Sequence, residues 1–429
     1  MDMRFSEFEP IRILKNLPEC DLLANPLLSP DEREFAAKFY EFLDQDLDND
    51  IKALEYLNYQ VEVPTEKAKA DIVIQIMQKL AMKGYYSVVL DPDKYAVGKI
   101  MRNALIAFAL CGGKWSEDSG KYIGGNWPIE MGRLAGGTLF CNPVNFKAND
   151  YQRENFLMPV ARDGEVASSA MTEFEAGSDI ARMELRMEES GDELVLYGKK
   201  IFITNGPIAK YILVYGRLDD GRLGATILDV NDPKTEHFLA TRLRTYGMED
   251  AFVSRLVFDG VHVPKENLLE GDGLDIAFHQ LTEERLVISA EALGDVAKKL
   301  LYSHSYAIER SQFGHHLNEY QSIRFPISNM VRQLKLLTDS LIYSARMMDS
   351  LSPDEVSKDM ARQAMGLKVA TTELAFEASI HCFRTMGGRG FIRQYSVPIG
   401  FLDAYCMIHG GGSNYVLSDS ESRQIFKGV

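Results

Sequence analysis

Apolar residues recur near helical spacing over an unusually long stretch in the last third of the chain. It covers 276–313, IAFHQLTEERLVISAEALGDVAKKLLYSHSYAIERSQF, and similar stretches follow at 317–348 and 354–388. Apolar residues three and four positions apart give a helix one buried face, which must pack against neighbouring helices. Three long helices in succession therefore predict an up-and-down helical bundle.

The middle of the chain has a different pattern. Residues 192–205 and 211–230 alternate β-branched, aromatic and polar side chains, which is typical of strands. Within the second stretch, Asp219, Asp220 and Gly221 form a good hairpin turn. These features predict a β domain between about residues 166 and 270.

The N-terminal part is mostly helical in character up to about residue 165. The segment 29–47, SPDEREFAAKFYEFLDQDL, opens on a serine cap with acidic residues in the first turn. A Gly-rich segment with two tryptophans, 114–128, is expected to interrupt the helices as a long loop. The sequence thus predicts an α+β chain in three parts: a helical domain (1–165), a β domain (166–273) and a C-terminal helical bundle (274–429).

The composition excludes some classes of function. The formal net charge of −15 over 429 residues argues against nucleic-acid binding, because phosphates require a basic surface. The longest strongly apolar run, 104–110, is far shorter than the ~20 residues that span a bilayer. The N-terminus lacks the apolar core of a secretory signal, and five scattered cysteines without a CxxC pair suit a reducing cytoplasm and indicate no metal site.

Several short motifs carry chemistry. The first, AMTEFEAGSD (170–179), is by itself no more than a capped turn with exposed hydroxyl and amide groups. The others follow in this order: KKIFITNGP (199–207), ERLVISAEALG (284–294), YAIERSQFG (306–314), YQSIRFPISNM (320–330) and FRTMGGRGF (383–391).

In this order and spacing, the motifs resemble those of the acyl-CoA dehydrogenase family of flavoproteins. The resemblance covers about residues 150–429, whereas the first 150 residues match mainly in helical character. It implies that the middle domain is an antiparallel, barrel-like β domain and that the C-terminal domain is a four-helix bundle. It also implies FAD as cofactor, a CoA thioester as substrate, an electron-transfer flavoprotein as electron acceptor, and a homotetramer or dimer. The glycines do not form a Rossmann GxGxxG after a strand, so a nicotinamide-binding fold is not expected.

The resemblance assigns flavin contacts to two strand ends. Met171 and Thr172 would present backbone N–H and hydroxyl groups to the pyrimidine edge of the ring, and Ile203 and Thr204 would do so near O4 and N5. An oxidised flavin offers acceptors at these atoms, so donors are the expected partners. Phe202 stands where the family usually has Trp, and a smaller ring there still packs against flavin.

Further residues match positions at which the family contacts the substrate or the cofactor. Ser178 matches a contact to the CoA chain. Arg310, Phe313 and Gln321 match residues that grip the FAD pyrophosphate and adenine of a neighbouring subunit. A cation against a diphosphate is the expected chemistry there.

The FRTMGGRGF motif has one departure from the family. Arg384 replaces a common Gln and would add positive charge near the same dinucleotide, or else interact as a helix-end arginine with the C-terminal helix dipole. Gly387 and Gly388 would allow close backbone approach to the cofactor.

A glycine run near the C-terminus, MIHGGGSNY (407–415), raises the question of the catalytic base. Much of the family has a base Glu at the position that matches Gly411, followed by a flavin-contacting pair that matches Gly412 and Ser413. The carboxylate is missing here. Gly411 keeps its backbone N–H, which in the family polarises the thioester carbonyl together with a ribityl hydroxyl.

Members with this vacancy, such as isovaleryl- and long-chain acyl-CoA dehydrogenases, carry the base on the first long C-terminal helix before an Arg. Glu284 and Arg285 occupy these positions, and Glu283 is the rival base in the same turn. Burial in an apolar acyl pocket would raise the pKa of such a carboxyl group toward neutrality, which suits a base. Arg285 would contact the CoA phosphates or hold the helix to the glycine loop.

Three functions follow from these residues. The first is α,β-dehydrogenation of an acyl-CoA, in which Glu284 takes the α-proton and flavin N5 receives the β-hydride. The second keeps the fold but changes the chemistry, as in relatives that oxidise nitroalkanes or remove sulfinate. The third is a flavin-binding scaffold without catalysis. A solvent-exposed Glu284 would exclude the first assignment of the base.

Overall fold

The computed structural model describes residues 17–59, 66–90, 97–119, 121–351, 358–392 and 400–426. The chain divides into two compact units. Unit 1 comprises Met1–Pro64, Tyr95–Trp127 and Arg285–Val429, and unit 2 comprises Thr65–Lys94 and Pro128–Glu284. The division falls within one long helix, between Glu284 and Arg285.

Unit 2 is built on a seven-stranded sheet with the order β3-β6-β4-β5-β9-β8, in which β7 also pairs with β6. Its strands are β3 (Ala167–Ala170), β4 (Arg186–Ser190), β5 (Glu193–Ile203), β6 (Tyr211–Leu218), β7 (Leu223–Asp229), β8 (Phe238–Arg242) and β9 (Ser254–Pro264). Most pairs are antiparallel, but β3 and β4 both run parallel to β6. The sheet is therefore mixed, which corrects the antiparallel pairing expected from the family resemblance.

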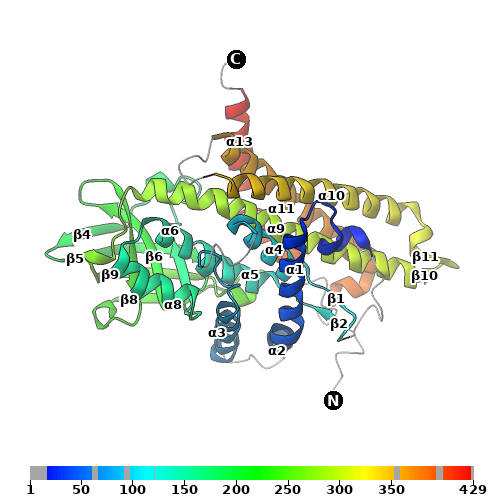
Figure 1. The fold of residues 1–429 in the computed structure, drawn as a ribbon, viewed down its shortest axis with the longest axis horizontal. Coiled ribbons are helices and arrows are strands. Elements are labelled where there is room, and N and C mark those ends of the chain that lie inside the picture. The colour runs from blue at the N-terminus through cyan, green and yellow to red at the C-terminus, as the bar shows by residue number, and fades with distance from the viewer. Residues whose placement is uncertain are drawn as a thin grey trace. The chain divides into compact units, whose positions relative to one another are not determined.

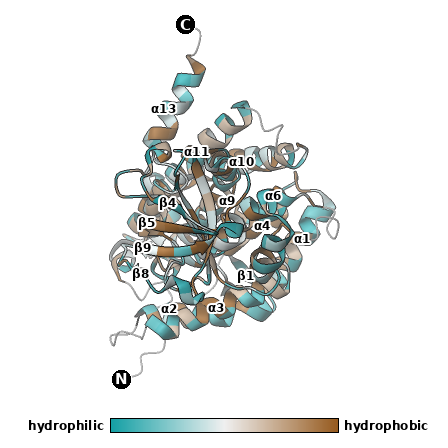
Figure 2. Ribbon diagram, turned by 90° about the vertical axis from the view of Figure 1, so that its left-hand side faces the viewer, coloured by the Kyte–Doolittle hydropathy of each residue, from teal (hydrophilic) through white to brown (hydrophobic). Residues whose placement is uncertain are grey.

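Alternating burial explains the strand region. Leu194 and Leu196 of β5 and Leu256 and Phe258 of β9 belong to one buried apolar cluster, and Figure 2 shows hydrophobic residues along these two strands. The predicted hairpin is confirmed: β6 and β7 pair antiparallel, and Gly221 adopts a positive φ of 83° in the turn.

Helices accompany this sheet in unit 2. They are α3 (Glu66–Met82), α5 (Trp127–Arg133, with Trp127 in unit 1), α6 (Cys141–Lys147), α7 (Asp150–Gln152), α8 (Met158–Ala161) and the first part of α9 (Gly273–Glu309). Within α5 the fully buried side chains of Glu130 and Arg133 form an ion pair. A buried arginine needs such a partner, because an isolated charge in the interior is very costly.

Unit 1 is almost entirely helical. Its helices are α1 (Pro30–Phe42), α2 (Asp48–Tyr59), α4 (Lys99–Gly112), the second part of α9, α10 (Gln321–Asp349), α11 (Lys358–Met386), α12 (Gly400–Met407) and α13 (Asn414–Ile425). The predicted cap of α1 is present: Ser29 and Glu32 form a reciprocal capping box. α10 and α11 run alongside each other, as Figure 1 shows.

Small residues allow α4 and α9 to approach closely in unit 1. A Cβ atom at Gly294 would lie 2.3 Å from the carbonyl oxygen of Phe108, and one at Gly112 would lie 2.9 Å from the carbonyl oxygen of Gly294. Nearly every residue of α4 is buried. The two backbones therefore touch at a crossing that only glycine permits.

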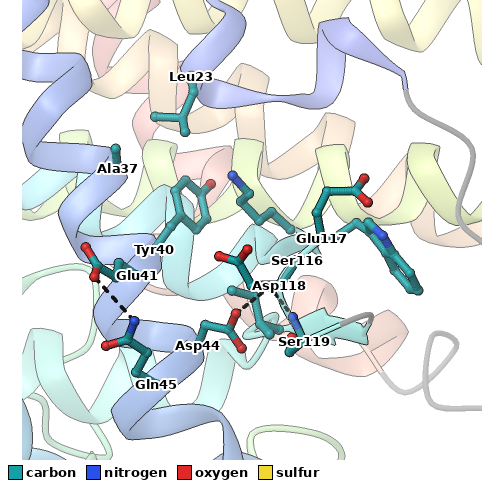
Figure 3. A pocket seen from close by; sticks show the side chains of 13 residues that line it. Leu23, Ala37, Tyr40, Glu41, Asp44, Gln45, Ser116, Glu117, Asp118 and Ser119 are labelled. Atoms are coloured by element: carbon teal, nitrogen blue, oxygen red, sulfur yellow. Dashed lines mark hydrogen bonds between the residues drawn. The ribbon is translucent and has the colours of Figure 1, made fainter.

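The segment 114–128 is more ordered than the predicted loop. It forms a hairpin of β1 (Lys114–Ser116) and β2 (Lys121–Ile123), and α5 begins at Trp127. Beside α1 the hairpin lines a pocket of about 470 Å³, where the Ser116 hydroxyl hydrogen-bonds Asp44 (Figure 3). None of the predicted site residues lines this pocket.

The predicted α+β architecture is confirmed, and the division into domains at 1–165, 166–273 and 274–429 stays a prediction. No helix in the described ranges combines the length and apolar character needed to cross a membrane.

Candidate active site

Two consecutive glutamates of α9 are buried. Glu283 is 5% exposed and Glu284 is 9% exposed. A solvated helix face is therefore excluded for both, and the burial that a helix-borne base requires is present at Glu284.

The two glutamates have different partners within unit 2. The side-chain amide of the buried Asn142 donates a hydrogen bond to the Glu283 carboxylate. Glu284 lies near Tyr215, since burial and, secondly, the Glu284 charge raise the pKa of that phenol. The Tyr215 hydroxyl itself donates to Gln280 Oε1 at 2.6 Å. The contact with Asn142 thus gives the Glu283 carboxylate a fixed neighbour in the interior of unit 2.

The two predicted flavin-contacting strand ends lie next to each other in unit 2. The amide of Ile201 donates to the Thr172 carbonyl at 3.0 Å, and Lys200 Nζ donates to the Met171 carbonyl at 2.8 Å. Thr172 and Thr204 are both half-buried. The motifs at 170–179 and 199–207 are therefore brought together by the sheet.

Hydrogen bonds to the carbonyl groups fix the direction of the amides. The Met171 carbonyl accepts from Lys200, and the Ile203 carbonyl accepts from Ser254 Oγ at 2.9 Å. In a planar trans peptide the N–H points opposite to the C=O. The amides of Thr172 and Thr204 consequently point away from these internal donors, which fits residues that offer N–H groups to the acceptor atoms of a flavin.

A buried ion pair supports this segment. Lys200 is fully buried, and its Nζ also contacts Glu173 Oε1 at 2.8 Å. Glu173 in turn accepts the backbone N–H groups of Glu184 and Leu185 at 2.6 and 2.9 Å. Burial, opposed by Glu173, lowers the pKa of Lys200 to about 8.

The end of β5 and the turn after it have an unusual backbone. Phe202 and Asn205 have positive φ values of 61° and 64°. Asn205 is buried, and its side chain donates to the carbonyls of Gly132 and Ala167 at 2.8 and 3.1 Å, which supports that conformation. Phe202 is 64% exposed, so its ring is available for contact with another molecule. Ser178 is also exposed, in the turn after Glu173.

In unit 1, the glycine loop is held by two cations. Arg285 Nε donates to the Gly411 carbonyl at 3.0 Å, so these two predicted residues are in contact. Lys368 Nζ donates to the carbonyls of Ile408 and Gly412 at 3.2 and 2.9 Å. Gly411 and Gly412 have positive φ values of 63° and 104°. The run is therefore a fixed turn and not a flexible linker. Ser413, the N-cap residue of α13, ends it.

The remaining predicted cofactor residues are exposed in unit 1. Arg310 follows the end of α9, and the ring of Phe313 is 94% exposed in the small hairpin of β10 (Ser311–Gln312) and β11 (His315–His316). Gln321 begins α10. Residues that contact the cofactor of a neighbouring subunit must be exposed on the single chain, as these residues are.

The C-terminal end of α11 carries the predicted cofactor residues of the FRTMGGRGF motif. Arg384 is exposed in its last turn, followed by the 3-10 segment Gly387–Phe391. Within the described part of the chain, a Cβ atom at Gly387 or Gly388 would meet nothing within 4 Å. Packing inside the described chain thus leaves room for a side chain at Gly388.

Some residues of these segments escaped the sequence analysis. Glu173, Lys200, Lys368 and Asn414 are all buried polar residues that organise the predicted motifs. A charged residue on the apolar face of a helix is the signal that could have drawn attention to Lys368. Its partners lie 40 or more residues away, so their identity could not be read from spacing.

Comparisons with known proteins agree with the geometry. The family model for the acyl-CoA dehydrogenase middle domain matches residues 168–261, and the model for the acyl-CoA dehydrogenase C-terminal domain matches residues 271–426. A mitochondrial isovaleryl-CoA dehydrogenase of Arabidopsis thaliana is 31% identical over 281 residues, covering 64% of this chain and 67% of the relative. The caffeyl-CoA reductase-Etf complex subunit CarC of Acetobacterium woodii is 25% identical over 340 residues, covering 77% and 83%.

Solved structures show the same fold. A glutaryl-CoA dehydrogenase from Mycobacterium smegmatis in complex with FADH2 superposes with a TM-score of 0.80 at 20% identity, covering 96% of this chain and 99% of that one. The prolyl acyl carrier protein oxidase AnaB gives 0.78 at 21% identity, covering 93% and 100%.

The chain therefore belongs to the acyl-CoA dehydrogenase family. The predicted family, enzyme class and FAD cofactor are confirmed at this level. The half-buried donors at Thr172 and Thr204 and the exposed cation at Arg310 fit this cofactor.

Proposed function

We propose that the protein is an FAD-dependent acyl-CoA dehydrogenase in which Glu284 is the catalytic base. FAD, when bound, accepts the hydride from the β-carbon of the acyl group. The α-proton goes to the Glu284 carboxylate, and the product is the α,β-unsaturated thioester. The substrate thus loses one proton and one hydride, which balances the reaction.

The observation that carries the proposal is the burial of Glu284 directly before Arg285, whose guanidinium contacts Gly411. A carboxylate shielded from water is a stronger base toward a weakly acidic C–H bond than a solvated one. Gly411 has no side chain that could act as a base. The chain's own base therefore has to come from elsewhere, and Glu284 has the burial for the task.

Other residues of this chain act around the thioester. The Gly411 N–H polarises the thioester carbonyl and stabilises the negative charge that develops when the α-proton leaves. Ser178 and Arg285 are the substrate-binding positions implied by the family. For Arg285, the contact with Gly411 favours holding the loop over gripping the CoA phosphates.

The cofactor residues divide into two groups. One receives the flavin ring and consists of Met171, Thr172, Phe202, Ile203, Thr204 and Ser413. The other serves the dinucleotide of a neighbouring subunit and consists of Arg310, Phe313, Gln321, Arg384, Gly387 and Gly388. The exposure of the second group supports a homotetramer, or a dimer, as the working state.

The electron acceptor and the compartment follow from the same proposal. An electron-transfer flavoprotein takes the electrons, which the relationship to an Etf-complex subunit supports. All five cysteines are free thiols, as expected for a reducing cytoplasm.

An anaerobic panel of acyl-CoA thioesters tests the function. The panel contains straight, branched, long, cyclic and aromatic acyl groups, and the absorbance of the bound flavin is recorded after mixing. A dehydrogenase bleaches its flavin in proportion to the added substrate and yields the enoyl thioester. Turnover of nitroalkanes or sulfinates without bleaching by any thioester would instead support the same fold with different chemistry.

A further inference from the structure

The loop between α12 and α13 combines high intrinsic freedom with a task that needs a fixed backbone. It contains Gly410, Gly411 and Gly412, and the last two adopt φ values that other residues rarely take. Glycines lose more backbone entropy on folding than any other residue, so a loop of this kind does not hold one conformation by itself. A backbone N–H that polarises a carbonyl must be fixed to a fraction of an ångström.

Lys368 of α11 supplies what the loop lacks. Its side chain is fully buried. The ammonium group donates to the Ile408 carbonyl at 3.2 Å, to the Gly412 carbonyl at 2.9 Å and to Asn414 Oδ1 at 2.7 Å. An ammonium group has three donors, and these three acceptors can use all of them.

The three acceptors lie on both sides of Gly411. Ile408 precedes it, whereas Gly412 and Asn414 follow it, and the carbonyl of Gly411 is held separately by Arg285. The amide of Gly411 thus lies within a short segment whose backbone is fixed at both ends. Loss of the ammonium group would remove a hydrogen bond on each side of Gly411, and the backbone bond from the Asn414 N–H to the Ile408 carbonyl at 3.0 Å would remain.

Asn414 extends the arrangement back to α11. Its side-chain nitrogen donates to Thr372 Oγ1 at 3.1 Å and to Glu373 Oε1 at 2.8 Å. The Thr372 hydroxyl donates to the Lys368 carbonyl at 2.8 Å. Lys368, Thr372 and Asn414 therefore form one connected network that orients the first residue of α13 relative to the glycine loop.

The energetics point to positioning as the reason for this lysine. Burying an ammonium group is costly, and an apolar side chain of similar length is commonly no worse for stability. An apolar residue would leave the carbonyls of Ile408 and Gly412 without this donor. What the lysine contributes beyond stability is the geometry of the segment that it holds.

We propose that Lys368 is a positioning residue that holds the Gly411 amide in place to polarise the thioester carbonyl, an inference that rests on the proposed function. It does not touch the substrate and acts only through the loop. Its loss should lower the rate of the chemical step while the enzyme still binds FAD and thioester.

The test compares Lys368→Met with Lys299→Met. Lys299 is a matched control, because it is an equally buried lysine whose ammonium group contacts Asp295, Ser379 and the Gly400 carbonyl, away from the glycine loop. The probe is cinnamoyl-CoA, whose long-wavelength absorption band shifts to the red when its thioester carbonyl is polarised. Flavin reduction by the best acyl-CoA and the dissociation constant of the probe are measured in parallel.

In the wild type, the long-wavelength absorption band of bound cinnamoyl-CoA should shift to the red. In Lys368→Met most of the shift should disappear and the rate of flavin reduction should fall about 10²-fold, the usual effect of losing one oxyanion donor. The dissociation constant should change by less than about threefold, and Lys299→Met should keep the full shift even if its melting temperature falls. A full shift in Lys368→Met would overturn the proposal, as would an equal loss in Lys299→Met.

Two further results separate a failure of the proposed function from a failure of the role of Lys368. If the wild type neither shifts the probe nor reduces its flavin, the proposed function fails, and that result is distinct from a failure confined to Lys368. If Lys368→Met does not fold, Thr372→Val takes its place, since it removes only the hydroxyl that supports Asn414. A partial loss of the shift supports the proposal, and an unchanged shift contradicts it.

Discussion

Arg285 Nε donates a hydrogen bond to the carbonyl oxygen of Gly411 at 3.0 Å. Arg285 directly follows the proposed base Glu284 in α9, and Gly411 occupies the position where much of the family carries its base. Within unit 1, the residue that follows the proposed base is therefore in direct contact with the glycine loop. The contact also explains how a glycine can stand at the old position without the loop losing its shape.

Arg285→Gln should slow flavin reduction about tenfold, because the Gly411 carbonyl loses a charged donor. Holding the loop and gripping CoA phosphates can be told apart with two thioesters of one acyl group, on CoA and on N-acetylcysteamine. The loop role predicts the same loss of rate with both. A loss of affinity confined to the CoA thioester would contradict it.

The two glycines of the loop should differ in their tolerance of a side chain. Gly411 has φ 63°, which alanine can adopt at a cost of about 1 kcal/mol. Gly412 has φ 104°, and a Cβ atom there would lie 3.1 Å from Leu417 Cδ2. Gly412→Ala should therefore lose more activity and more thermal stability than Gly411→Ala. Activity and melting temperature of the two variants, measured together, check this order.

The pH dependence of FAD retention should reflect Lys200. Because its pKa is lowered to about 8, the ammonium group loses its charge above that pH and its hold on Glu173 and Met171 weakens. FAD retention, followed by ultrafiltration, should fall as the pH rises from 7 to 9.5. Lys200→Met should retain FAD poorly at every pH, and Lys210→Met, which removes a half-buried partner of Glu165, should behave as the wild type.

The effect of Lys200 on stability has the opposite sign. In the unfolded chain the lysine keeps its proton up to about pH 10.4. Between pH 8 and that value the unfolded state binds more protons than the folded state, so the unfolding free energy rises with pH. The stability of the wild-type apoprotein relative to Lys200→Met should therefore increase across this range. No change would show that Lys200 keeps its charge through pH 9, and a decrease would show that folding raises its pKa.

The sequence predicted the parts of this molecule that depend on local patterns. The cap at Ser29 and Glu32, the hairpin at Asp219–Gly221 and the long helix from residue 273 all follow from neighbouring residues. The candidate flavin and base positions were predicted from short motifs that resemble those of the family. The parallel pairing of β3 and β4 with β6 depends on segments far apart in the chain, and no local pattern records it.

The burial and the partners of the supporting polar residues could not be predicted from local patterns either. Lysines are almost always exposed, so the sequence alone gives little reason to expect the full burial of Lys200 and Lys368. Their burial follows from tertiary packing, and their acceptors at Gly412 and Met171 lie 44 and 29 residues away. The hairpin at 114–123 also differs from the predicted loop. Its strands are only three residues long, so the sequence gives little sign of them.

The most direct test of the central claim is flavin bleaching in Glu284→Gln, with Glu283→Gln as its control. Both variants replace a buried carboxylate by an amide of the same shape. Under anaerobic conditions, Glu284→Gln should bind FAD and the best acyl-CoA of the panel but reduce its flavin at least about 10³-fold more slowly than the wild type. Glu283→Gln should keep most of the rate. Bleaching at the wild-type rate in Glu284→Gln, or its loss in Glu283→Gln alone, would contradict the assignment of Glu284 as the base.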